Sequence, residues 1–467
     1  MSPSRPSRNR LHRVLKTRDV LTLAFGAIIG WSWVLMTGHW ILVGGSLGTL
    51  VAFAIGGFAI ILIGLTYAEL AAALPWVGGE HVYTRRGLGD GASFVCSWAL
   101  VMAYVTICVF ESVALPTALV YLVPDIQLVT LWSVAGAPVD LGFVLVGILG
   151  AVVMTIVNVV GIRTAAIVQT VITITIVIAG LVLMTGAAVS GNADNLEPLL
   201  PNGLAGVLGV LIMVPAMLVG FDVIPQSAEE IDLPPQRIGQ LLILSVFIAV
   251  AFYGLVTLSV ALARPPALWE GATLATADAA HTLWGSPWAG VFLVVGGVGG
   301  ILTSWNAFII GASRVLFSMA ESGHLSRVFA TLHPRFRTPY VGILAIGLAS
   351  IAAPFFGRTI LVWLIDAGSL AVMVAYVFVA AAFLALRRNE PDLPRPFKVP
   401  AGRTVGALAL VLGIALILVY FPGSPSALLW PQEWVIVLAW VAVGSVVYLT
   451  ARRRHPRRLD EQEGDGP

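Results

Sequence analysis

Four acidic side chains lie within or beside long apolar stretches of this sequence: Glu69, Glu111, Asp222 and Asp366. An ionisable group in a long apolar segment is costly, so it usually pairs with a partner, binds a ligand or moves a proton. Glu69 ends its stretch in TYAELAAALP, where a loop arginine can reach it, and we interpret it as structural. Asp366 is interpreted as a helix-packing residue, with a gate as the alternative.

Glu111 and Asp222 are the candidates for carrying a proton. Glu111 lies deep in its stretch, in TICVFESVALP. Protonated, it would bond a neighbouring helix; ionised, it would pair with a substrate amine or relay a proton, and the sequence does not decide between these roles. Asp222 adjoins a predicted helix break, where unpaired backbone would tolerate an ionised carboxylate. A functional role is therefore favoured for Asp222.

The segment GAIIGWSW, residues 26–33, interrupts an apolar run from 20 to 43. A helix broken inside a bilayer frees backbone N–H and C=O groups, which is tolerated where they line a cavity or bind a ligand. The ends of the two half-helices then offer partial charges, as in the central site of a transporter. The alternative is that the two glycines only let helices pack closely. Pro215 and the Gly220-Phe221-Asp222 segment mark a second interruption.

Thr303, Ser304 and Asn306 place several oxygen atoms within one helical turn. Thr303 and Ser304 are candidates for a cation site, formed with carbonyl groups of the first break, and the alternative is helix-to-helix hydrogen bonding. The only two cysteines share one apolar stretch, which excludes a disulfide framework. The sequence has no phosphate-binding glycine loop, paired metal-ligand helix or nucleophile elbow. It therefore predicts no metal, no cofactor and no enzymatic activity.

The elements that must position these groups are long apolar helices. The chain has 467 residues, of which 58% are hydrophobic and 11% charged, and its mean hydropathy is +0.94. This composition predicts an all-α polytopic membrane protein. We expect twelve transmembrane helices, at residues 20–43, 48–72, 93–120, 141–160, 166–189, 204–224, 240–262, 288–318, 340–356, 359–386, 404–421 and 433–450.

The distribution of positive charge predicts the orientation. With twelve spans, all of the 26 Lys and Arg residues except Arg264 and Arg358 fall on one side. Because cytoplasmic loops carry the excess of Lys and Arg, both termini are expected in the cytoplasm. Residues 1–18 and 452–467 are interpreted as cytoplasmic tails of a cell-membrane protein. The net charge of +2 suggests no nucleic-acid partner.

The two interruptions fall in the first and the sixth predicted span. An odd repeat length inverts the second copy in the membrane, so we expect inverted repeats at 19–190 and 204–386. Residues 403–451 would add two helices outside the repeat.

Several blocks resemble, in order, the amino acid–polyamine–organocation superfamily of secondary transporters. GAIIG at 26–30 resembles its glycine-rich break in helix 1, and GFDVIPQSAEEIDLP at 220–234 resembles its break in helix 6. Residues 67–89, 158–169 and 313–340 are similar to the end of helix 2, the start of helix 5 and the end of helix 8. The resemblance extends over nearly the whole chain.

This resemblance implies a leucine-transporter-like fold with a substrate site between helices 1 and 6. Backbone amides at residues 28–30 would bind a substrate carboxylate, and carbonyl groups at 24–26 and 219–222 would bind its amine. Phe221 would stand over the substrate as an aromatic gate. The expected substrate-binding residues are Ala24, Gly26, Ile28, Ile29, Gly30, Trp31, Ser32, Val219, Gly220, Phe221 and Asp222.

The sequence departs from the family pattern in two places. After Gly30 the family usually has small residues, whereas this chain has Trp31 and Trp33, two indoles that would reduce the site or cover a cationic group. Some members carry a helix 5 lysine where sodium binds in relatives, whereas residues 166–189 contain no lysine. Glu111 or Asp222 then becomes the expected proton carrier.

The resulting prediction is a secondary transporter that imports an amino acid or small amine with a proton, by alternating access. The alternatives are an exchanger, or a permease for ethanolamine or a polyamine. A membrane sensor that binds ligand without moving it is a further alternative, which the lack of a sizeable signalling domain disfavours. The expected partners are the small-molecule substrate, a proton and the lipid bilayer.

Overall fold

A computed structural model describes residues 11–123, 129–134, 137–270, 272, 274–357, 360–424 and 427–454. The outer parts of both predicted tails, residues 1–10 and 455–467, lie outside the described residues, as does position 359 at the start of the tenth predicted span.

The first apolar stretch is interrupted where the glycines indicated. α1 (Thr17–Ile28) starts with Asp19 in its first turn, where a carboxylate complements the helix dipole. The chain leaves the helix for three residues and resumes as α2 (Ser32–Leu35). α3 (Thr37–Ala73) contains a kink at Gly45, whose φ of 74° favours glycine. This kink separates the first and second predicted spans.

The second interruption is also present. α8 (Gly203–Leu211) and α9 (Val214–Met217) are followed by five residues outside any helix, and the chain continues as α10 (Val223–Gln226). Pro215 lies at the start of α9, where its missing N–H is tolerated. Gly220 has a φ of 125°, a backbone conformation that side-chain-bearing residues rarely adopt.

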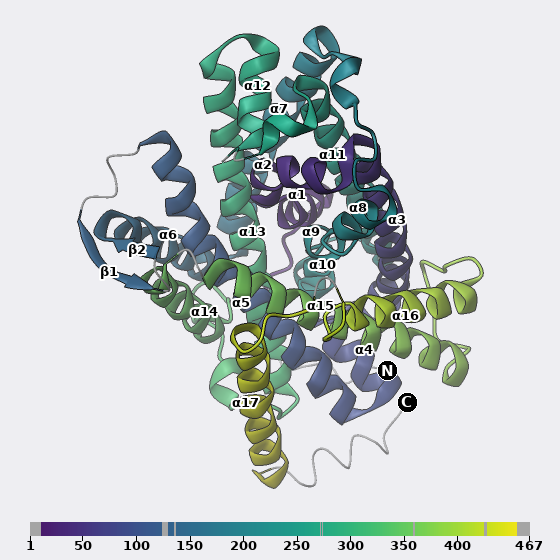
Figure 1. Cartoon of the computed structure of the whole chain (residues 1–467). Coiled ribbons are helices and arrows are strands. Elements are labelled where there is room, and N and C mark those ends of the chain that lie inside the picture. The colour runs from purple at the N-terminus through teal and green to yellow at the C-terminus, as the bar shows by residue number, and fades with distance from the viewer. Residues whose placement is uncertain are drawn as a thin grey trace.

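The remaining elements complete a mostly helical chain (Figure 1). Between the two interruptions lie α4 (Glu80–Leu88), α5 (Asp90–Leu122), the antiparallel hairpin of β1 (Thr130–Val134) and β2 (Ala137–Asp140), α6 (Leu141–Val160) and α7 (Ile162–Ser190). After α10 come α11 (Pro235–Ala263), α12 (Ala275–Trp284), α13 (Pro287–Glu321), α14 (Tyr340–Ala352), α15 (Ile360–Asn389), α16 (Gly402–Leu418) and α17 (Gln432–Arg454). The hairpin and α12 were not predicted from the sequence.

Eight of the described helices are long and apolar enough to cross a membrane: α3, α5, α6, α7, α11, α13, α15 and α17. Shorter apolar helices cover Gly203–Met217, Tyr340–Phe356 and Gly402–Leu418. The chain is therefore a mostly helical, multi-pass membrane protein. The count of twelve spans and the two inverted repeats stay predictions.

The interrupted helices lie at the centre of the molecule (Figure 1). α1 packs against α7, α11 and α13, and α10 packs against α1 and α13. The apolar segment of α13 is 83% buried, whereas that of α17 is only 11% buried. α13 is thus a central scaffold for the breaks, and α17 is peripheral.

The residues that precede α1 pair with the segment that follows α10. Leu15 forms a parallel bridge with Ile231, and the Leu15 N–H donates to the Glu230 carbonyl at 2.9 Å. The Glu230 carboxylate is itself buried and forms a bidentate ion pair with Arg314, with both hydrogen bonds at 2.9 Å. The segment that follows α10 is therefore fixed both to the residues that precede α1 and to α13.

Candidate functional site

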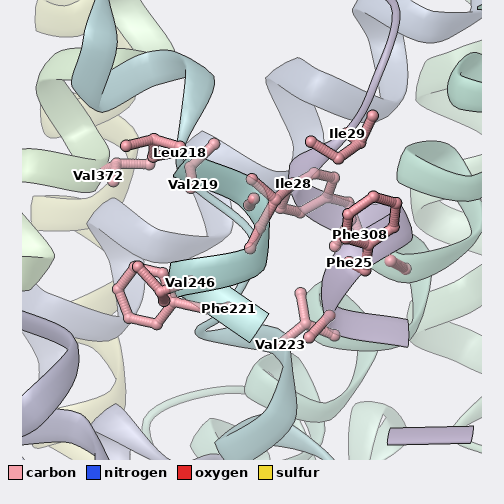
Figure 2. Packing of buried hydrophobic residues seen from close by; sticks show 14 of the residues in the cluster. Phe25, Ile28, Ile29, Leu218, Val219, Phe221, Val223, Val246, Phe308 and Val372 are labelled. Carbon is pink, nitrogen blue, oxygen red and sulfur yellow. The ribbon is translucent and has the colours of Figure 1, made fainter. Parts of the chain in front are cut away.

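The two helix breaks touch each other. A Cβ atom added to Gly220 would lie 2.7 Å from the carbonyl carbon of Ala27 and 2.9 Å from the backbone nitrogen of Ile28. Only a residue without a side chain allows the backbones to approach so closely. In Figure 2, Ile28 of the first break lies close to Val219 of the second. Glycine is thus required at position 220 because the backbones of the two breaks, which are far apart in the sequence, come into contact there.

A cavity of about 310 Å³ lies beside this contact. Its walls come from the first break and the helix ends beside it, from α5, from α9 and the second break, and from α13 and α15, and they are mainly apolar. The lining residues are Ala27, Ile28, Gly30, Trp31, Ser32, Leu35, Met36, Thr106, Ile107, Phe110, Glu111, Ala216, Met217, Val219, Ser304, Phe308, Ile365, Asp366, Gly368, Ser369 and Val372. A largely apolar cavity with a few polar groups is typical of a small-molecule site.

Five of the expected substrate-binding residues line this cavity: Ile28, Gly30, Trp31, Ser32 and Val219. The other six are not among the lining residues, namely Ala24, Gly26, Ile29, Gly220, Phe221 and Asp222. They form or support the two breaks without contributing to the walls.

The backbone after the first break offers hydrogen-bond donors. Within the described part of the chain, the N–H groups of Trp31, Ser32 and Trp33 have no backbone or side-chain acceptor. The Ser32 hydroxyl lies 2.8 Å from the Tyr253 hydroxyl, which also donates to the Ile28 carbonyl at 3.1 Å. Tyr253 of α11 thereby bonds residues on both sides of the break. The free N–H groups can donate hydrogen bonds to an anionic group.

Glu111 of α5 is the buried acid in the cavity wall. One carboxylate oxygen accepts a hydrogen bond from the Ser304 hydroxyl of α13, and a Cβ on Gly30 would lie 3.4 Å from that same oxygen. Among the described residues, the second oxygen has no hydrogen-bond partner. Glu111 therefore retains an unused acceptor beside the first break.

Asp366 of α15, which we interpreted as a helix-packing residue with a gate as the alternative, also lines the cavity. Its carboxyl group interacts with Glu433, which lies in the first turn of α17, and with Tyr420. The side chain thus both packs against the C-terminal helices and reaches the cavity. Within the list of lining residues there is no Lys or Arg, so both charged groups of the wall are acidic.

The two indoles after Gly30 have different surroundings. Trp31 lines the cavity and packs its ring against Gly297 of α13. Trp33 points elsewhere, with its ring centroid 5.5 Å from that of Phe252, and it is absent from the walls. The expectation that both indoles flank the site is therefore correct only for Trp31. Helical spacing turns neighbouring side chains to different faces, which the sequence pattern did not resolve.

The expected aromatic gate lies away from the cavity in this structure. Phe221 is fully buried, and its ring packs 5.3 Å from both Tyr67 and Tyr376. Figure 2 shows Phe221 pointing away from Phe308, beside Val246. The aromatic rings that do line the cavity belong to Phe110, Phe308 and Trp31.

Asp222 lies on the far side of the contact between the breaks. Its carboxylate accepts hydrogen bonds from the Tyr104 hydroxyl at 2.7 Å and from the Gly220 N–H at 2.9 Å. These bonds stabilise the irregular backbone before α10. Asp222 and Glu111 are therefore held on opposite sides of the breaks.

The candidate cation-site hydroxyls are engaged in other bonds. Thr303 donates within α13 to the carbonyl groups of Gly299 and Gly300, and Ser304 donates to Glu111. Beside Gly26, where a cation would meet the first break, stands Gln169 of α7. Its amide nitrogen donates to the Thr22 carbonyl at 3.3 Å.

Gln169 belongs to a chain of buried amides that the sequence had not indicated. The Asn158 amide donates to the Asn306 oxygen at 2.9 Å, and the Asn306 amide donates to the Gln169 oxygen at 2.8 Å. A neutral amide donor therefore occupies the junction of α1, α7 and α13. Helical spacing alone did not show that these three residues, on three helices, face one another.

Glu69 is structural, as predicted. It accepts from Arg387 at 2.9 Å and lies 3.0 Å from Arg395, so two guanidinium groups neutralise it. This ion-paired cluster fixes the end of α3 to the end of α15 and lies outside the cavity.

The comparisons with known proteins agree with this arrangement. A family model described as amino acid permease matches residues 15–446. The branched-chain amino acid permease BcaP of Bacillus subtilis is 26% identical over 457 residues, which cover 96% of this chain and 94% of that protein. The methylthioribose transporter of the same organism is 26% identical over 455 residues, covering 95% and 94%. Cationic amino acid transporter 4 of Mus musculus is 26% identical over 402 residues, covering 82% of this chain and 61% of that protein.

Proposed function

The chain belongs to the amino acid permease family, and on this premise we propose that it is a secondary transporter that imports an amino acid or small amine together with a proton. The observation that carries the proposal is the cavity at the meeting of two broken helices, with Glu111 in its wall. Substrate would reach this cavity from each side of the membrane in turn, by alternating access. Both termini would lie in the cytoplasm, as the Lys and Arg distribution favours.

The polar groups of the cavity suit the two ends of an amino acid. A substrate carboxylate would accept from the backbone N–H groups of Trp31, Ser32 and Trp33, which have no other acceptor among the described residues, whereas the Ile29 and Gly30 N–H groups already donate to the Phe25 and Ile28 carbonyls. The ammonium group would face carbonyl groups of the breaks and the free oxygen of Glu111. An apolar side chain would contact Ile107, Phe110 and Phe308.

The coupling ion is proposed to be a proton. The neutral amide donor of Gln169 lies beside Gly26 and donates to the Thr22 carbonyl, which disfavours a cation bound next to the first break. The remaining candidates for coupling are Glu111, which faces the cavity, and Asp222, which faces the opposite side of the breaks. A proton on Glu111 would respond to the substrate amine because the two groups would share one space.

A cationic amine is the second candidate substrate. Glu111 and Asp366 both line the cavity, and no basic residue stands among the lining residues to offset them. An amine without a carboxylate, such as ethanolamine or a polyamine, would be held by these two acids. Exchange of such an amine for an amino acid is the matching alternative mode.

Uptake into proteoliposomes tests these proposals. Purified protein would be supplied with labelled amino acids, ethanolamine or putrescine under an imposed inward proton gradient. Concentrative amino acid uptake that a protonophore abolishes and that sodium does not affect is the expected result. Uptake of only the carboxylate-free amines would replace the amino acid with the second candidate. Binding without any flux would instead favour a sensor.

A further inference from the structure

A second buried acid stands near Asp222, on the side away from the cavity. Glu80, the first residue of α4, is fully buried, and one of its carboxylate oxygens accepts from the Gln226 amide of α10. The other oxygen has no hydrogen-bond partner among the described residues. The Glu80 carboxyl group interacts electrostatically with that of Asp222. The two carboxyl groups thus share one buried region beneath the breaks.

Two tyrosine hydroxyls interact with these acids. The Tyr376 hydroxyl of α15 faces Asp222, and the Tyr67 hydroxyl of α3 faces Glu80. The two rings lie 5.5 Å apart, centroid to centroid. Neither hydroxyl meets the geometry of a full hydrogen bond in this state. Hydroxyl groups aligned between two carboxyl groups can pass a proton by donating one and accepting another.

The region holds several more unpartnered polar atoms. Among the described residues, buried oxygens without a hydrogen-bond partner belong to Tyr67, Glu80, Tyr83, Gln226, Ser227 and Tyr376. Each such oxygen costs free energy unless it binds something, and a group of them in one place indicates a functional site. Most buried polar groups in proteins are satisfied, so a group of such oxygens calls for a water, proton or ligand to bind them.

The charges around Glu80 favour its protonated form. The titratable groups that interact with it are Asp222, Tyr67, Tyr83, Cys96, Tyr104 and Tyr376, and none of them is cationic. Burial, and then the charge of Asp222, raise the pKa of Glu80 well above its usual value of 4.5. Two carboxylates without a cation cannot both be charged at low cost, so the pair holds a proton.

The neighbouring titratable residues His81 and Glu230 have other partners. His81 contacts the hydroxyls of Ser97 and Ser322 at 2.8 Å with its two ring nitrogens, and burial, then His324 and Arg85, lower its pKa. Glu230 is paired with Arg314. Glu80 and Asp222 are therefore the two buried acids of this region that no described histidine or arginine pairs with.

We propose that Glu80 is a second proton-binding group of the transport cycle, which receives the proton that Asp222 releases. In the step, the O–H bond of the Asp222 acid breaks and its proton goes to the Tyr376 oxygen. Tyr376 gives its own proton to Tyr67, and Tyr67 gives its own to the Glu80 carboxylate. Asp222 ends as a carboxylate, Glu80 as a neutral acid, and both tyrosines are regenerated. Opening of the adjacent end of the protein would then let Glu80 lose the proton to the cytoplasm.

This inference rests on the proposed proton coupling, but its first test does not need transport. Infrared difference spectra of the reconstituted full-length protein would be recorded while the pH is stepped, without substrate. The expected result is a C=O band of a protonated carboxyl group that titrates in the wild type and is missing in Glu80→Gln. Glu229→Gln is the matched control, since Glu229 lies in the same region and accepts from the Val77 N–H. That control should keep the band.

The second test measures coupling. In proteoliposomes with an internal pH-sensitive dye, Glu80→Gln should lower proton-driven amino acid accumulation on the order of 100-fold, in the range that a positioned proton-transfer group contributes. Exchange of internal for external amino acid at equal pH should remain, because it needs no net proton movement. Glu80→Asp keeps a carboxyl group and should retain part of the accumulation.

The two tests separate the possible failures. A titrating band that persists in Glu80→Gln would overturn the assignment of the proton to Glu80. A spectral change caused by Na⁺ at constant pH would assign the site to a metal cation and also overturn it. Amino acid uptake without proton flux in the wild type would contradict the proposed coupling, while the band would still report on Glu80. If Glu80→Gln does not fold, Glu80→Asp must shift the midpoint of the band.

Discussion

Glu111 of α5 accepts a hydrogen bond from Ser304 of α13 at the wall of the cavity, directly beside Gly30. The bond joins two helices that border the first break. It leaves one carboxylate oxygen without a hydrogen-bond partner among the described residues. A proton or a substrate amine that binds this oxygen therefore changes the charge of the cavity wall and also affects the hydrogen bond to α13.

Replacing this acid should separate coupling from exchange. In Glu111→Gln the amide keeps an acceptor for Ser304 but cannot bind or release a proton at neutral pH. We expect pH-dependent accumulation to fall on the order of 100-fold, with exchange still measurable. The measurement is uptake with and without a proton gradient. Ser304→Ala is the control that removes the bond and keeps the acid; accumulation by Glu111→Gln equal to the wild type would exclude Glu111 as the proton carrier.

The contact between the breaks should be sensitive to a single methyl group. Gly220→Ala introduces a Cβ that would lie 2.7 Å from the Ala27 carbonyl carbon, at a φ of 125°. A strained backbone of this kind costs about 1–3 kcal/mol, which corresponds to a loss of binding of roughly 5- to 150-fold if the breaks move apart. The loss of affinity is measured by equilibrium binding of a labelled amino acid. Gly254→Ala in α11, where an added Cβ meets no atom within 4 Å, should bind normally.

The shape of the cavity should depend on one of the two indoles. Trp31→Gly removes a ring from the wall, so larger substrates should be accepted and the competition profile should broaden. Trp33→Phe changes a ring that lies outside the walls and packs on Phe252, and it should leave the profile as it was. Competition of unlabelled amino acids against a transported one measures both. A broadened profile for Trp33→Phe alone would reverse the assignment of the two rings.

Stability should depend on pH through Glu80. Because its pKa is raised in the folded protein, the unfolded chain loses the proton from about pH 4.5 upward while the folded protein keeps it. The unfolded state then binds fewer protons, so the free energy of unfolding falls as pH rises from 4.5 towards the raised pKa, by up to about 1.4 kcal/mol per pH unit. Below pH 4.5 this contribution is constant.

The Glu80→Gln substitution should remove this slope. Thermal unfolding in detergent, followed from about pH 5 to 8, should show a melting temperature that falls less steeply for the variant than for the wild type. Glu229→Gln should keep the wild-type slope. Parallel curves for Glu80→Gln and the wild type would mean that Glu80 is ionised over this whole range.

The sequence by itself determined the membrane class, the family resemblance and the places where two helices break. These features depend on local properties: the length of apolar runs, and the positions of glycine and proline, which limit backbone conformation within a few residues. Glu69 was also interpreted correctly, because its place at the end of an apolar run puts loop arginines within reach.

Only the tertiary structure decided which side chains share a space. Gln169 and Asn306 are 137 positions apart, and Glu80 and Gln226 are 146 apart, yet each pair is hydrogen-bonded. Phe221 lies in the second break, as the motif predicted. Its ring, however, packs against Tyr67 and does not line the cavity. Such outcomes depend on the rotation of each helix about its axis, which is set by simultaneous packing against several neighbours. A one-dimensional pattern does not contain that rotation.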